Sequence, residues 1–220
     1  MTEYIIHQAE TMAVYAPVWG FLLVFLFMTM ESTVLPIPSE VVMIPAGFMA
    51  YRGELSFGSF WPDFTAMVIM GTLGSLCGAW INYIVSLKLG RPVLYKYGKY
   101  FFLPKHHLEK AEEIFRQYGD IATFVCRLVP VLRHLISIPA GLSQMNKLSF
   151  SAYTVAGAGV WMIILTAIGA YLGKILGKSA SYSDIVHKGE ALLHEHFWLM
   201  MAIPALAIVL YIVIKKKIMK

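Results

Sequence analysis

The 220-residue chain is too apolar for a soluble globular domain. Hydrophobic residues make up 58% of the sequence and charged residues 14%, whereas roughly 25% of the residues in a typical soluble domain are charged. The formal net charge is +5, but eleven of the eighteen basic residues fall in two short stretches, 88–116 and 215–220. Such clusters are typical of loops beside membrane-spanning helices, so no nucleic-acid partner is predicted.

Four uncharged apolar runs follow one another along the chain, at residues 11–30, 64–87, 148–173 and 197–214. A helix needs roughly 20 apolar residues to cross a bilayer. The runs are continuously apolar and do not alternate, so the predicted fold is an all-α, polytopic membrane protein. Residues 1–14 are assigned to an N-terminal segment ahead of the membrane domain, and the first run, which begins within it, leaves two topologies open. A crossing helix puts the N-terminus inside, and a segment that folds back within the membrane leaves it outside.

The basic stretches predict the orientation of the second half, because basic loops mark the cytoplasmic side. Both 88–116 and the C-terminal tail are therefore predicted inside. The runs at 148–173 and 197–214 supply the two crossings between them, which predicts an extracytoplasmic loop at 176–196 and a C-terminal transmembrane helix with a basic tail at 197–220. Both segments can lie inside only if the number of crossings between them is even, which requires that residues 120–147 do not cross the membrane.

Residues 129–142 repeat residues 35–48 at a constant spacing, so that Gly141 lies 94 residues after Gly47. Five of the fourteen positions are identical and five more exchange one apolar residue for another. Proline breaks helices and glycine permits tight turns, so each copy is predicted to form a hairpin of two half-helices. The predicted bends are at Pro36, Pro38, Pro45, Gly47, Pro130, Pro139 and Gly141.

The two predicted hairpins, at about 20–49 and 120–147, are separated by the single crossing at 64–87. If each is re-entrant, they enter the membrane from opposite faces and form an inverted repeat. Inverted repeats with interrupted helices are typical of transport sites near the bilayer midplane. The alternative is a chance match, since proline and glycine are frequent in membrane helices.

The hairpins carry charged residues embedded in apolar sequence: Glu31 and Glu40 in the first, and Arg127 and Arg133 in the second, with His134 at the position that matches Glu40. One ionised side chain at the bilayer centre costs at least ~2.5 kcal/mol on insertion scales. Opposite charges on facing hairpins would offset that cost. Two arginines also suit a phosphate, because guanidinium offers paired planar donors, and buried carboxylates are candidate proton carriers. The alternative is a static salt bridge that only orients the hairpins.

The motifs resemble the DedA family, also described by its VTT or SNARE-associated domain, over about residues 15–175. The resemblance rests on Glu31-xxx-LPIPSE and on Arg127-xx-Pro130-xx-Arg133 followed by Pro139-Ala140-Gly141, Met145 and Phe150. Gly78, Tyr83 and Gly90 also fit the family pattern, whereas Ala79, Ser86 and Leu87 depart from it.

The resemblance implies a multi-pass protein of the bacterial plasma membrane that moves an anionic lipid between leaflets. Undecaprenyl phosphate, recycled for envelope synthesis, is the expected lipid. On this expectation Arg127 and Arg133 bind the phosphate, while Glu31 and Glu40 gate it or carry protons. A phospholipid scramblase and a proton-dependent transporter for membrane homeostasis are the alternatives that the family leaves open. No metal, cofactor or particular oligomeric state is predicted.

A membrane lipid-phosphate phosphatase is the main competing class, because such enzymes also use arginines for phosphate. They resemble a pattern with Lys seven residues before an Arg-Pro pair, and here Ile84 holds that place before Arg91-Pro92. Neither Pro-Ala-Gly segment is followed by a nucleophilic His, and His134 has no evident nucleophile beside it. The sequence therefore favours a transporter over an enzyme.

Overall fold

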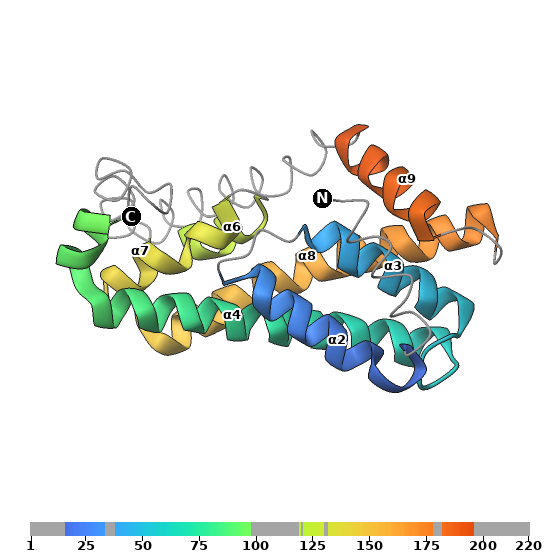
Figure 1. Ribbon diagram of the computed structural model, residues 1–220, viewed down its shortest axis with the longest axis horizontal. Coiled ribbons are helices and arrows are strands. Elements are labelled where there is room, and N and C mark those ends of the chain that lie inside the picture. The colour runs from blue at the N-terminus through green and yellow to red at the C-terminus, as the bar shows by residue number, and fades with distance from the viewer. Residues whose placement is uncertain are drawn as a thin grey trace, which may run out of the picture. The chain divides into compact units, whose positions relative to one another are not determined.

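Helices account for the regular structure of the part of the chain that the computed structural model describes, which is residues 16–33, 38–97, 119, 121–129, 132–177 and 182–195. In chain order they are α2 (Ala16–Glu31), α3 (Ser39–Arg52), α4 (Phe60–Tyr97), α6 (Leu132–Leu135), α7 (Ser137–Leu142), α8 (Lys147–Leu176) and α9 (Tyr182–Glu195), with a short unnumbered helix at 121–127 (Figure 1). The all-helical prediction is confirmed for these residues.

Two of the described helices are long and apolar enough to cross a bilayer, and they coincide with the runs predicted at 64–87 and 148–173. The spans are Phe60–Lys88, with 29 residues, and Lys147–Leu176, with 30 residues. At 1.5 Å per residue each is about 45 Å long, which exceeds the roughly 30 Å hydrocarbon core. The final crossing at 197–214 and the basic tail lie outside the described residues.

Helix α2 accounts for the first apolar run. Its described part has 16 residues, Ala16–Glu31, and residues 11–15 of the run lie outside the described part of the chain. Trp19, Leu22, Leu26 and Met30 recur at helical spacing along it and are all more than 40% exposed. An exposed stripe of large apolar side chains is what a helix in contact with lipid presents.

The chain divides into two compact units that share the long helices. Unit 1 contains α2, α3, residues 60–75 of α4, residues 159–176 of α8, and α9. Unit 2 contains residues 76–97 of α4, the helix at 121–127, α6, α7 and residues 147–158 of α8. Each unit therefore holds one of the two predicted hairpin regions.

In unit 1, α3 packs directly on the backbone of α8. A Cβ atom on Gly47 would overlap the carbonyl oxygen of Thr166, and one on Gly169 would overlap the carbonyl oxygen of Ile44. Small residues at membrane helix contacts allow backbones to approach this closely. Glycine on both sides of the contact is therefore a packing requirement.

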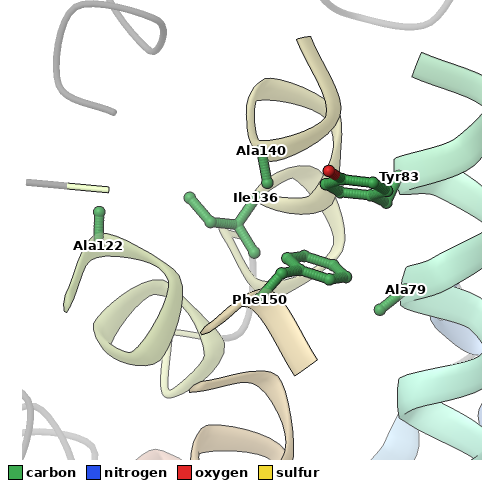
Figure 2. Close-up of a cluster of buried hydrophobic side chains, with 6 residues drawn as sticks. All are labelled: Ala79, Tyr83, Ala122, Ile136, Ala140 and Phe150. Carbon is green, nitrogen blue, oxygen red and sulfur yellow. The ribbon is translucent and has the colours of Figure 1, made fainter. Parts of the chain in front are cut away.

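In unit 2, the α6–α7 segment packs against α4 and α8 through an apolar cluster. Figure 2 shows the Tyr83 and Phe150 rings lying beside Ile136 and Ala140. The ring centroids of Tyr83 and Phe150 are 4.8 Å apart, and the Tyr83 hydroxyl donates to the Met145 carbonyl oxygen at 2.6 Å. This cluster holds the second hairpin region on the long helices.

The bend predicted at Pro45 and Gly47 is wrong, whereas in the second copy a one-residue break at Ile136, between α6 and α7, lies three residues before Pro139. Helix α3 continues through Pro45 and Gly47, and α7 continues through Pro139 and Gly141. Proline removes only one backbone donor, and membrane helices tolerate this where neighbouring helices pack around the site. The two glycines instead give close helix contacts, since a Cβ atom on Gly141 would overlap the Tyr83 carbonyl oxygen.

The longer interruptions lie near the first proline of each copy. Helix α2 ends at Glu31 and α3 begins at Ser39 after Pro38, while the helix at 121–127 and α6 are separated by residues 128–131. The described helices between 119 and 146 are all too short to cross a bilayer. Pro36 and Pro130 lie outside the described residues.

The connection at 176–196 contains a helix that the sequence analysis did not predict. Helix α9 packs on α3, where Val186 and Val41 form a small buried cluster, and Gly189 lies close to Ile44. Its outer positions Asp184, His187 and Lys188 are exposed. This amphipathic helix covers one side of α3.

Asp63 organises the turn that leads into α4. It is fully buried, and its carboxylate accepts hydrogen bonds from the backbone N–H groups of Phe57 and Ser59 at 3.1 and 3.2 Å. We expect Asp63→Ala to lower the free energy of unfolding by about 1–2 kcal/mol, the usual contribution of a cap. Thermal unfolding in detergent measures this. Asp63→Asn keeps an acceptor in place, and an equal loss in both variants would contradict the hydrogen-bond explanation.

Candidate functional site

The two predicted acidic residues lie in unit 1, on either side of the break between α2 and α3. Glu31 is the last residue of α2 and only 3% exposed. Glu40 is the second residue of α3 and half-buried, where the helix N-terminus favours a negative charge. Unit 1 therefore presents two carboxylates at one interruption of the backbone.

Glu31 is held by hydroxyl groups. The Ser32 hydroxyl donates to Glu31 Oε2 at 2.9 Å, and the Ser32 and Ser75 hydroxyl oxygens are also 2.9 Å apart. All three side chains are buried. A buried carboxylate that accepts hydrogen bonds avoids part of the cost of leaving water.

The residue before Glu40 ties the start of α3 to α8. Ser39 is fully buried, and its hydroxyl oxygen accepts a hydrogen bond from the indole Nε1 of Trp161 at 3.1 Å. Because Ser39 precedes Glu40 in the first turn of α3, this bond restricts the backbone from which the Glu40 carboxylate extends.

The two predicted arginines lie in unit 2, also on either side of a break. Arg127 is the last residue of the helix at 121–127 and is 2% exposed. Arg133 is the second residue of α6 and is 6% exposed. Guanidinium groups this deeply buried need hydrogen-bond acceptors or an anionic partner.

Arg127 is tied to the segment that carries Arg133. Its Nη2 donates to the Ser137 hydroxyl oxygen at 2.7 Å, and Ser137 lies on α7 directly after α6. A Cβ atom on Gly157 would lie 2.6 Å from the Arg127 Cβ atom. Gly157 in α8 therefore makes room for the aliphatic part of the Arg127 side chain, and the Ser137 hydroxyl holds its guanidinium group.

His134, the accessory position, lies beside Arg133. The Arg133 Nε donates to the His134 Nε2 at 3.4 Å. His134 is therefore placed to orient one side of the Arg133 guanidinium.

Ser32, Ser75 and Ser137 are polar contacts that the sequence analysis missed. Ser75 and Ser137 are small hydroxyl residues within apolar segments, and that isolation is the signal that could have singled them out, whereas Ser32 directly follows the predicted Glu31. Among the residues that the structure describes, no group of three or more His, Cys, Asp or Glu side chains could hold a metal ion.

Comparison with known proteins identifies the family. The VTT domain of a known family matches residues 37–171. The chain is 34% identical to undecaprenyl phosphate transporter A of Bacillus subtilis, over 82% of this chain and 83% of that protein. It is 30% identical to the Staphylococcus aureus protein of the same name, over 77% of this chain and 84% of that protein.

A third relative carries an enzyme-like name. The alkaline phosphatase-like protein of Lactococcus lactis is 36% identical over 76% of this chain and 79% of its own length. No solved structure matches the chain. The VTT match spans well over half of the sequence and contains the α3, α4, α6, α7 and most α8 positions described above. The chain belongs to the VTT-domain or DedA family of membrane proteins.

Proposed function

We propose that this protein is a transporter that moves an anionic lipid between membrane leaflets, with undecaprenyl phosphate as its substrate. The relatives named undecaprenyl phosphate transporter A support the substrate. The prenyl tail stays in the lipid while the phosphate crosses, so no wide pore is required. On this proposal the protein is not an enzyme.

The observation that carries the proposal is the pair of buried arginines in unit 2. Arg127 and Arg133 are 2% and 6% exposed, and the Ser137 contact attaches Arg127 to the segment that contains Arg133. Arginine binds phosphate through two parallel hydrogen bonds. A site that keeps two guanidinium groups out of water and restricts one of them is preorganised for a phosphate monoester.

The two acidic residues serve a different step of the transport cycle from phosphate binding. Glu31 and Glu40 gate the phosphate or carry protons, and their placement at the break between α2 and α3 supports this role. Interrupted helices in transporters place backbone and side-chain groups at the substrate site. The buried hydroxyl contacts of Glu31 support a carboxylate that spends part of the cycle away from water.

The fold that we propose is an inverted repeat with two re-entrant hairpins. Matching glycine contacts support the repeat. A Cβ atom on Gly74 would meet Phe25 and Met28, and one on Gly157 would meet Phe124 and Arg127. Phe124 and Arg127 each lie 99 residues after their counterparts in α2 (124 − 25 and 127 − 28).

A second pair of glycine contacts also corresponds between the two copies. Gly47 approaches the carbonyl oxygen of Thr166, and Gly141 approaches that of Tyr83. The glycines differ by 94 positions (141 − 47) and the carbonyls by 83 (166 − 83), and Gly157 also follows Gly74 by 83. A single offset of 83 residues between α4 and α8 therefore relates both pairs of contacts. This supports an internal duplication and argues against a chance match.

The proposed location is the bacterial plasma membrane, with several spans and a cytoplasmic C-terminus. The bacterial relatives support the compartment, and the lysines at 215–217 and 220 support the side. The connection that contains α9 would then be extracytoplasmic.

Transport by purified protein in liposomes tests the proposal. Fluorescent polyprenyl phosphate is placed in both leaflets, and a membrane-impermeant quencher reports how quickly protected lipid becomes accessible. We expect faster exchange than in protein-free liposomes, and competition by unlabelled polyprenyl phosphate but not by phosphatidylcholine. Equal exchange of both lipids would instead support a scramblase. Release of inorganic phosphate would overturn the transporter proposal and support the enzyme that the name of the Lactococcus lactis relative suggests.

Ser137→Ala tests whether the contact with Arg127 matters for transport. The variant removes the acceptor at 2.7 Å from Arg127 Nη2 with little change in volume. Hydrogen bonds to charged groups contribute ~1.5–3 kcal/mol, so we expect transport to slow by at least about tenfold. Ser143→Ala is the control, because the Ser143 hydroxyl bonds only to the nearby Ala140 carbonyl oxygen in the described structure. Equal rates for Ser137→Ala and the wild-type protein would contradict the assigned role.

A further inference from the structure

Three oxygen-bearing side chains form a continuous buried chain in unit 1. Ser32 Oγ donates to Glu31 Oε2 at 2.9 Å, and Ser32 Oγ lies 2.9 Å from Ser75 Oγ. A hydroxyl has one proton. When Glu31 is ionised it can only accept, so the Ser32 proton points at Glu31 and Ser75 is the donor in its contact with Ser32. The order of donors is therefore Ser75 to Ser32 to the carboxylate.

Close helix packing explains why these groups meet. Ser75 follows Gly74 on α4, and a Cβ atom on Gly74 would overlap the Phe25 carbonyl oxygen of α2. The absence of a side chain at Gly74 lets α4 lie against α2. Ser75 is thereby brought to the end of α2, where Glu31 and Ser32 lie.

The Ser75 hydroxyl is not required to fill space. On the relation between α4 and α8 described above, the counterpart of Ser75 is Ala158, 83 residues later (158 − 75). Both residues are buried to nearly the same extent, at 4% and 3% exposed. The second unit therefore packs this position with a methyl group, which leaves the hydroxyl of Ser75 available for a polar role.

We propose that Ser75 is a positioning residue for Glu31 and acts through the Ser32 hydroxyl. Its hydrogen bond orients the Ser32 oxygen, and this orientation directs the Ser32 proton at Glu31 Oε2. The chain links the carboxylate at the backbone break to a membrane-crossing helix. This inference rests on the proposed function in one respect, that Glu31 takes part in transport.

Infrared spectroscopy tests the contact without any transport measurement. In protein labelled with 13C-glutamate, the Glu31 carboxylate band is identified as the band lost in Glu31→Gln. We expect Ser75→Ala to shift that band, because the Ser32 hydroxyl loses its own donor and turns. Thr72→Val is the matched control on α4, since the Thr72 hydroxyl donates to the Val68 carbonyl oxygen of its own helix. An unshifted band in Ser75→Ala would overturn the proposal.

A double-mutant cycle tests the consequence for transport. We expect Ser75→Ala to slow transport by a few-fold and by no more than about tenfold in the wild-type background, because it removes the neutral hydroxyl–hydroxyl hydrogen bond that orients Ser32. In the Glu31→Gln background the same change should have no further effect. An equal slowing in both backgrounds would show that Ser75 acts independently of Glu31 and would overturn the proposal. If the wild-type protein moves no polyprenyl phosphate, the proposed function fails while the infrared result still decides the Ser75 contact.

Discussion

Gly169→Ala is expected to destabilise the protein severely. The added methyl group would overlap the Ile44 carbonyl oxygen and would lie 3.0 Å from the Phe48 backbone nitrogen. Both neighbours are backbone atoms of α3, so no side chain can rotate away to relieve the contact. Overpacking typically costs 1–3 kcal/mol, and backbone neighbours place this substitution at or above the upper end. About 3 kcal/mol corresponds to a fall of roughly 10 °C in melting temperature.

Gly159→Ala is the matched control in the same helix. A Cβ atom at Gly159 would lie 3.8 Å from the Thr72 hydroxyl oxygen, an ordinary van der Waals distance. Since alanine is about 1 kcal/mol better than glycine in a helix interior, we expect this variant to be neutral or slightly more stable. The melting temperatures of both variants, measured in the same detergent, test this difference. Equal melting temperatures would contradict the backbone contact between α3 and α8.

Arg127→Ala is expected to reduce lipid transport on the order of 100-fold. The phosphate would lose two charge-assisted hydrogen bonds, at ~1.5 kcal/mol or more for each, and about 3 kcal/mol corresponds to a factor of this size. Arg127→Lys keeps the charge but loses the paired donors, so it should recover only part of the rate. Initial rates of polyprenyl phosphate exchange in liposomes measure the effect.

Arg52→Ala is the control for general effects of removing an arginine. Arg52 forms a partly exposed salt bridge with Glu54 and lies over the Phe48 ring, 5.1 Å from its centroid. Neither contact involves the phosphate site, so transport should stay near the wild-type rate. Melting temperatures separate transport loss from unfolding. A folded Arg127→Ala protein that transports normally would reject Arg127 as a phosphate ligand.

The crossing helices could be predicted from sequence because length and hydropathy alone determine whether a helix can span a bilayer. The expected runs at 64–87 and 148–173 lie within α4 and α8. Helix α9 was missed because only one face of it is apolar, and mean hydropathy gives no sign of such a helix. Its apolar positions have meaning only once α3 is available to cover them.

The charged positions could also be predicted, because ionisable residues in apolar runs are few. Their partners could not. Ser75 lies 44 residues after Glu31, and Ser137 lies ten after Arg127 across a helix break. Such pairs depend on which helices pack together. The error at Pro45 has a similar origin, since glycine two residues after a proline serves equally well for a turn or for a close helix contact.

The α3–α8 contact has a mechanical consequence. Where Gly47 meets Thr166 and Gly169 meets Ile44, backbone lies on backbone, with no side chain between the two helices at these points. Packed helices can undergo shear, in which one slides a short way along the other, and interlocking rotamers are what normally resist it. At these two glycines the helices cannot come closer, and no side chain there opposes a short slide of α3 along α8.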